Sequence, residues 1–167
     1  MANKLYSAQE TAIVFGSEGG DDVDWSTESI ADNAGRQSDT HSFAAASRAD
    51  RFLLEFWTQF QATPVVGDTL RLYIKEYGNE GTADHPTNDD GAGDAAVSAE
   101  DKLHNLKLVQ LLVVDEAAAN IEMGVKVEVS ILVRHFALVL WNASGAAITT
   151  DVAETKARLT PMPPELQ

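Results

Sequence analysis

The strongest constraint on the fold is an alternation of side chains between residues 123 and 133. In this segment the positions Val125, Val127, Val129, Ile131 and Val133 share one parity, and Lys126, Glu128 and Ser130 take the other. Successive side chains of a β-strand point to opposite faces, so this period of two predicts a strand with one apolar and one polar face. We therefore expect a sheet whose inner face covers a core.

Other segments of the chain carry related patterns. Residues 51–61 place large apolar side chains at alternate positions with one interruption, and residues 69–75 alternate without one. Proline and glycine in residues 63–68 indicate a turn between them, so we expect these two strands to lie side by side. Residues 106–114 are rich in aliphatic side chains that suit a strand, and residues 136–141 alternate again. Several short strands without a sustained 3.6-residue period predict a mainly β, antiparallel sandwich or barrel.

The chain divides by composition into two parts, 1–50 and 51–167. We interpret 1–50 as an extended N-terminal arm with a first strand, because residues 16–35 are small and polar and offer little to a core. We interpret 51–167 as the body of a single β-sandwich domain. Residues 77–101 form a long acidic loop, and the spacing of Ser98 and Asp101 predicts a helical turn at its end.

Length and composition set limits on function. A chain of 167 residues is long enough to bury roughly 70% of its unfolded surface in one domain. It contains no cysteine, which excludes thiolate catalysis and cysteine-ligated metals. The net charge of −14 comes from 12 Lys and Arg against 26 Asp and Glu, and it opposes nucleic-acid binding. We find no signal peptide or membrane span, so we expect synthesis in the cytoplasm and no membrane partner.

Metal, cofactor and catalytic sites are not indicated. Two groups of aspartates could offer oxygen ligands to calcium, namely Asp21, Asp22 and Asp24, and Asp89, Asp90 and Asp94. Neither group has the spacing of a calcium loop, and the histidines His41, His85, His104 and His135 are scattered. We expect no cofactor and no enzyme activity, although a pair of carboxylates for glycoside hydrolysis needs proximity only in space.

The triplet Asn142-Ala-Ser144 matches a glycosylation acceptor, and Ser144 could in principle be a nucleophile. The segment lacks the Gly-x-Ser-x-Gly elbow of a serine hydrolase, however. We interpret Asn142 to Gly145 as a turn that follows a core strand, because these residue types tolerate positive φ.

Three tryptophans are the candidate interface residues. Trp57 and Trp141 each have the opposite parity to their apolar neighbours, so each either covers a second apolar layer or projects to an interface. Trp25 stands alone in a polar segment and suits an anchor in a partner's pocket, since aromatic side chains concentrate binding energy at interfaces. The alternative is that the arm folds back and Trp25 caps its own sandwich.

Three segments together resemble a family of known proteins. They are the polar N-terminal segment rich in serine and glycine, the turn and strand Thr63-Pro-Val-Val-Gly-Asp-Thr-Leu-Arg-Leu-Tyr-Ile74, and Val139-Leu-Trp-Asn-Ala-Ser-Gly-Ala-Ala147. The chain resembles small bacteriophage virion proteins that decorate or cement the capsid. The resemblance implies a β-sandwich, often of jelly-roll type, that binds the major capsid protein on the outside of the virion. It also implies self-association, frequently as a trimer, and no catalytic residues.

Two other functions stay open at this stage. Within structural proteins, the chain could be a tail or head–tail component. From another class, it could be a carbohydrate-binding sandwich that uses Trp57 or Trp141 as a stacking platform.

Overall fold

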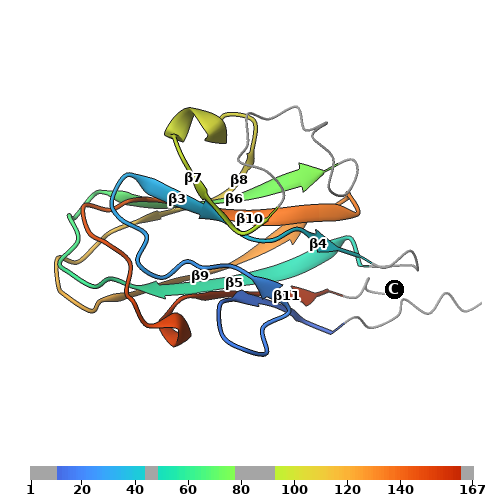
Figure 1. Ribbon diagram of the computed structural model, residues 1–167, viewed down its shortest axis with the longest axis horizontal. Helices are drawn as coiled ribbons and strands as arrows, with labels where there is room; N and C mark the ends of the chain where they lie inside the picture. The colour runs from blue at the N-terminus through green and yellow to red at the C-terminus, as the bar shows by residue number, and fades with distance from the viewer. Residues whose placement is uncertain (1–10, 44–48, 78–92, 163–167) are drawn as a thin grey trace, which may run out of the picture.

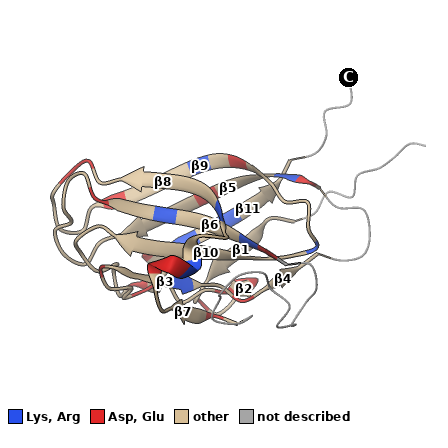
Figure 2. Ribbon diagram, turned by 90° about the horizontal axis from the view of Figure 1, so that it is seen from above, with Lys and Arg blue, Asp and Glu red and all other residues tan. Residues whose placement is uncertain are grey.

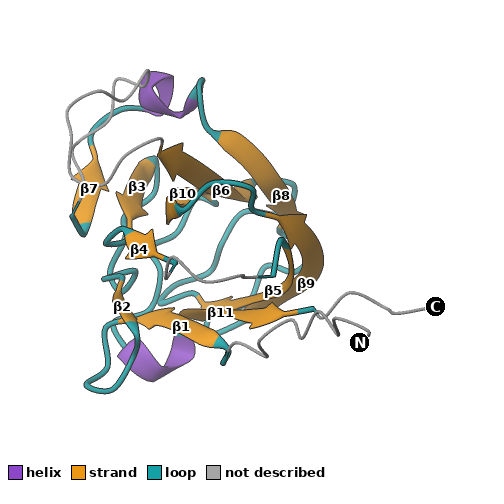
Figure 3. Ribbon diagram, turned by 90° about the vertical axis from the view of Figure 1, so that its right-hand side faces the viewer, coloured by secondary structure: helices purple, strands orange, loops and turns teal. Residues whose placement is uncertain are grey.

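The computed structural model describes residues 11–43, 49–77 and 93–162, which form two β-sheets packed face to face (Figures 1 and 3). The first sheet has the order β2 (Val23–Asp24), β1 (Ile13–Gly16), β11 (Lys156–Pro161), β5 (Arg51–Gln59) and β9 (Glu122–Ser130). The second has the order β7 (Ala95–Val97), β3 (Ala34–Gln37), β10 (His135–Ala143), β6 (Thr69–Tyr77) and β8 (Lys107–Val113). A short strand, β4 (His41–Ser42), also pairs with β10. The expectation of a mainly β fold with antiparallel sheets is confirmed.

The alternation that opened the sequence analysis becomes strand β9. Its inward side chains Val125, Val127 and Val129 lie opposite Phe56, Leu54 and Phe52 of β5. The phenylalanines and Leu54 are almost fully buried, so the two strands supply one wall of the core between the sheets. Burial of such large apolar side chains is the main stabilising term of a sandwich.

The expectation that the strands in residues 51–61 and 69–75 lie side by side is wrong. β5 pairs with β9 and β11 in the first sheet, whereas β6 pairs with β10 and β8 in the second. The loop between β5 and β6 crosses from one sheet to the other. This crossing lets the apolar faces of both strands meet in the same core, which a hairpin within one sheet would not do.

The expected arm is not seen in residues 11–43. These residues add β1 and β2 to the first sheet and β3 and β4 to the second. The segment contains few apolar residues, but Phe15, Trp25 and Ile30 all lie in the main core. A glycine is also required where β3 meets β10. A Cβ on Gly35 would lie 2.7 Å from the Trp141 ring, so only glycine lets these two strands approach so closely.

A second, smaller apolar cluster lies on the outer face of the second sheet. It contains Tyr73, Val97, Leu103, Val139 and Trp141. Leu103 belongs to the short 3-10 helix η1 (Glu100–Leu103), which lies over this sheet in Figure 1. The helical turn expected near Ser98 is therefore present, but Ala99 occupies its N-cap and gives no side-chain cap. A further 3-10 turn, η2 (Val152–Glu154), precedes β11.

Candidate functional site

Exposed aliphatic side chains gather along one edge of the sandwich. The large apolar side chains that are exposed in the described part of the chain are Val65 (51%), Val66 (56%), Leu108 (51%), Leu111 (44%), Val113 (51%) and Leu132 (73%). We call Leu108, Leu111 and Val113 the β8 strip. The other pair, the valine tip Val65–Val66, lies beside the end of β8, because the Gly67 N–H donates to the Val114 carbonyl over 2.9 Å. Five of the six exposed side chains thus belong to one region.

The β8 strip faces outward because of its pairing with β6. Leu112 lies opposite Leu70 and is buried, so Leu111 and Val113 on either side of it point out. The register shifts between Leu72 and Tyr73, where β8 carries one extra residue. This bulge keeps Leu108 on the outer face as well. The aliphatic segment 106–114 gave no sign of this in the sequence, because the unbroken apolar stretch from Leu111 to Val114 does not reveal which face is buried.

β8 is the last strand of its sheet, and part of its backbone points away from β6, toward the side where β9 lies and where the Lys107 Nζ donates to the Ser130 carbonyl over 2.7 Å. The Val114 N–H donates to the Asp68 carbonyl over 2.8 Å, and its own carbonyl accepts from Gly67. Both groups of Val114 therefore face β6, and in an antiparallel ladder those of Val113 and Leu111 face the opposite way. The Leu111 carbonyl accepts a hydrogen bond from the Gln110 side chain over 3.1 Å. Within the described residues no strand pairs with this edge of β8.

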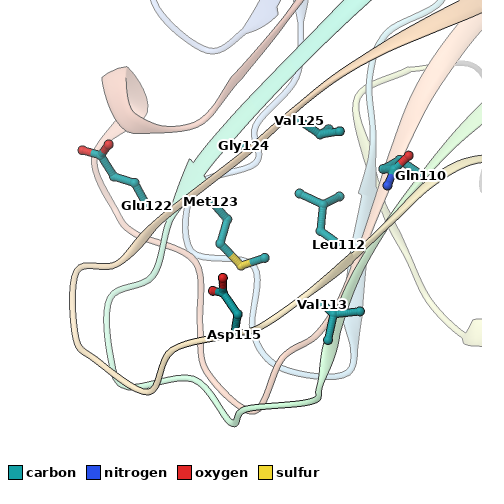
Figure 4. Close-up of a pocket in the computed structure, with 8 residues that line it drawn as sticks. All are labelled: Gln110, Leu112, Val113, Asp115, Glu122, Met123, Gly124 and Val125. Carbon is teal, nitrogen blue, oxygen red and sulfur yellow. The ribbon is translucent and has the colours of Figure 1, made fainter.

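A groove of about 360 Å³ lies between β8 and β9 (Figure 4). Its apolar lining includes Leu112, Met123 and Val125. Asp115 and Glu122 also line it and are exposed. The groove thus combines a few apolar side chains with acidic groups, and its accessible lining is more polar than apolar.

The outer face of the first sheet has a different character. Glu55 lies between Lys126 at 2.5 Å and Arg158 at 2.5 Å. Hydrogen bonds from Lys126 and then Arg158 lower the pKa of Glu55. Arg51 pairs with Glu128 at 2.6 Å on the same face. Figure 2 shows that both signs of charge lie on these strands, whereas β8 is uncharged between its ends.

The three candidate tryptophans do not come together. Trp25 is fully buried in the core, where its Nε1 donates to the Arg36 carbonyl over 3.2 Å and its ring lies 6.1 Å from that of Phe56. The geometry matches the alternative in which this segment folds back on its own sandwich. Trp141 is only 4% exposed and lies in the second apolar cluster. Trp57 is half-buried on the outer face of the first sheet, opposite Gly124 of β9.

Asn142 and Ser144 are buried, but the turn expected from Asn142 begins only at Ser144, because Asn142 and Ala143 are the last residues of β10. The Asn142 Nδ2 donates to the carbonyls of Ile30, Ala31 and Ala146 at 3.1, 3.2 and 2.8 Å. Its Oδ1 accepts from the Ser144 hydroxyl at 2.6 Å. Gly145 follows with a φ of +78°, where a side chain is unfavourable. A carboxamide with both ends bound inside the protein is not accessible to a glycosylating enzyme.

The acidic residues that could have bound calcium serve the fold instead. Asp21 accepts from the Glu18 N–H at 2.9 Å, and Asp22 accepts from the Val14 N–H at 2.9 Å. Asp94 accepts from Arg36 at 2.7 Å and from Ser26 at 2.5 Å. Although burial opposes the shift, these bonds lower the pKa of Asp94. Asp89 and Asp90 lie outside the described residues, and within those residues no three acidic or histidine side chains are grouped to hold a metal.

Two histidines, His41 and His135, lie on the paired strands β4 and β10, but within the described residues they join no group of three metal-ligating side chains. His41 packs against Phe43 and Phe136 at ring distances of 5.2 and 5.6 Å, and burial lowers its pKa. The His135 Nδ1 lies 2.8 Å from the Ser42 hydroxyl, His104 is exposed, and His85 is outside the described residues.

Comparison with known proteins gives no family for the chain. No protein-family model matches it, and no curated protein matches it significantly. Within the described ranges, no helix has the length and apolar character needed to cross a membrane.

Proposed function

We propose that the protein is a bacteriophage cement or decoration protein, a non-catalytic virion component that binds the outside of the assembled capsid. It is made in the host cytoplasm and contacts the major capsid protein in many copies. A protein that binds the assembled shell but not free subunits stabilises the shell by mass action. Each copy that bridges neighbouring subunits adds contact free energy that must be lost before the shell opens.

The observation that carries this proposal is the exposed valine tip, which lies beside the β8 strip. Contiguous exposed apolar surface on a soluble protein indicates a contact with another macromolecule. Here the surface lies on a chain with a net charge of −14, along a strand that has no charged residue from Leu108 to Val113. A protein-binding face of this kind is what a capsid-bound sandwich requires.

We propose further that the sandwich is of jelly-roll type, a fold used by viral capsid and lectin domains. Eight strands of the described chain have four residues or more, and they are β1, β3, β5, β6, β8, β9, β10 and β11. The first of these pairs with the last, the second with the seventh, the third with the sixth and the fourth with the fifth. This nested pairing supports the assignment. The extended arm predicted in residues 1–50 and the long acidic loop predicted in residues 77–101 fall in part on residues 1–10, 44–48 and 78–92, which lie outside the described residues.

The proposal is tested by mixing the purified protein with matching undecorated capsids. We expect it to sediment with the capsids and to raise the temperature at which they rupture. Val66→Asp at the valine tip should weaken binding, whereas Leu132→Asp, at an exposed apolar residue outside the valine tip, should not. If the protein neither sediments with capsids nor changes the rupture temperature, the cement function is wrong. Sedimentation with isolated tails instead would indicate a tail or head–tail component.

One observation favours the carbohydrate-binding alternative. Trp57 keeps part of its ring exposed on a flat sheet face, next to a glycine and close to charged residues. Trp25 and Trp141 are buried, so a change of tryptophan fluorescence on adding a glycan would report on Trp57. A saturable change that Trp57→Phe abolishes would support sugar binding, and no change across a glycan panel would exclude it for those sugars.

A further inference from the structure

We propose that two copies of this chain associate through β8, which pairs antiparallel with β8 of the second copy about a two-fold axis. The second sheet of each copy, which ends in β8, would then join that of the other copy in one continuous sheet. This contact goes beyond the proposed function, because it requires no capsid. It names the partner of the β8 strip and leaves the valine tip for the shell.

The backbone of β8 is arranged for this pairing. The N–H and carbonyl groups of Leu111 and Val113 face away from β6, as the bonds of Val114 to Asp68 and Gly67 show. With Leu112 on the axis, Leu111 of one copy lies opposite Val113 of the other. Both residues direct their backbone groups to the shared edge, so each pair can exchange two hydrogen bonds. The Gln110 side chain that now caps the Leu111 carbonyl would be displaced to solvent.

The side chains of β8 leave this edge unprotected. Edge strands in soluble proteins usually carry charges that prevent pairing with other molecules. β9, the neighbouring edge strand of the other sheet, follows this rule, because its outer face carries Glu122, Lys126 and Glu128. From Leu108 to Val114, by contrast, β8 has no charged residue. On the outer face the pairing would bring Leu111, 44% exposed, against Val113, 51% exposed.

The charges at the ends of β8 favour the antiparallel direction and a second copy as the occupant. Lys107 stands at the start of the strand, and Asp115 and Glu116 follow its end. A two-fold axis places the Lys107 end of each copy near the acidic end of the other. A parallel arrangement would place like charges together instead. Two-fold contacts are the commonest form of self-association among soluble proteins, and each such contact is self-complementary.

Sedimentation velocity over a concentration series, with no capsid present, tests the pairing. We expect a monomer–dimer equilibrium for the wild-type chain. Leu111→Lys should raise the dissociation constant by roughly tenfold or more, because it places two like charges in the contact. Val113→Pro should have a similar effect, since it removes an edge N–H that takes no part in the internal ladder. Leu132→Lys is the matched control and should leave the equilibrium unchanged.

Far-ultraviolet circular dichroism and thermal unfolding verify that each variant is folded. Asp115→Lys combined with Glu116→Lys gives the strand two basic ends, and should weaken the dimer more at low salt than at high salt. A wild-type chain that stays monomeric at every concentration would overturn the proposal. So would a trimer, or a dimer that Leu111→Lys and Val113→Pro both leave intact. None of these results depends on capsid binding, so the failure of either proposal can be recognised separately.

Discussion

The outer faces of the two sheets meet solvent in opposite ways. On the first sheet, Glu55 joins Lys126 and Arg158 in an ion-pair network, and Arg51 pairs with Glu128. On the second sheet, a cluster around Trp141 is covered by η1, and beyond it the β8 strip is exposed. The charged side chains of the first face pair with one another. The second face carries an apolar cluster that the chain itself covers and an apolar strip that it leaves exposed, and our proposed contact at β8 rests on that difference.

The largest expected difference between the two faces is in the free energy of unfolding that is lost when a tryptophan is removed from each. Trp141→Ala removes a ring that is only 4% exposed, and should lower the free energy of unfolding by about 3–5 kcal/mol. Trp57→Ala removes a half-buried ring from the charged face and should cost about 1–2 kcal/mol. Urea unfolding of both variants measures the two values. Equal losses would mean that the second cluster does not stabilise its sheet as the structure indicates.

A smaller effect is expected from the ion-pair network. Glu55→Gln should cost about 1 kcal/mol at neutral pH, because Lys126 and Arg158 are partly exposed to solvent. The pKa of Glu55 in the folded chain lies below its ordinary value of 4.5. Its contribution is therefore complete above that value and is lost as the pH falls through the folded pKa. The difference in unfolding free energy between wild type and Glu55→Gln should shrink in acid, and a constant difference would contradict the role of the pairs.

The smallest effect on stability is expected at the β8 strip. Leu111→Lys changes an exposed side chain, so under dilute conditions its unfolding free energy should differ from wild type by no more than about 0.5 kcal/mol. Thermal or urea unfolding at low concentration checks this value. A large loss would show that Leu111 supports the fold of the single chain. In that case its effect on association could not be assigned to the contact.

Sequence patterns predicted some strands well because their two faces differ in chemistry. β9 could be placed from its alternation, although the strand ends at Ser130, and a turn near Gly145 could be predicted from its residue types, although β10 continues to Ala143 before it. The β8 strip could not, because Leu111 and Leu112 are equally apolar and only pairing with β6 decides which is buried. Trp25 shows the same limit, since a tryptophan in a polar segment is compatible with both a partner's pocket and the protein's own core.

The sequence also could not predict which strands pair with one another. β5 and β6 have the alternation and the turn of a hairpin, yet each pairs with strands distant in the chain. The local turn permits both a hairpin and a crossing between sheets, and the choice depends on burying both apolar faces together. Such a long-range requirement leaves no mark in a short segment.

Hydrogen exchange of the two edge strands tests the central claim most directly. The amides of Leu111 and Val113 on β8 should exchange more slowly as protein concentration rises or when capsids are added, whereas the amides of β9 that face away from β5 should not change. This result would show that another protein molecule contacts the edge of β8 and that none contacts the edge of β9. Exchange at Leu111 and Val113 that stays fast under all these conditions would contradict the account.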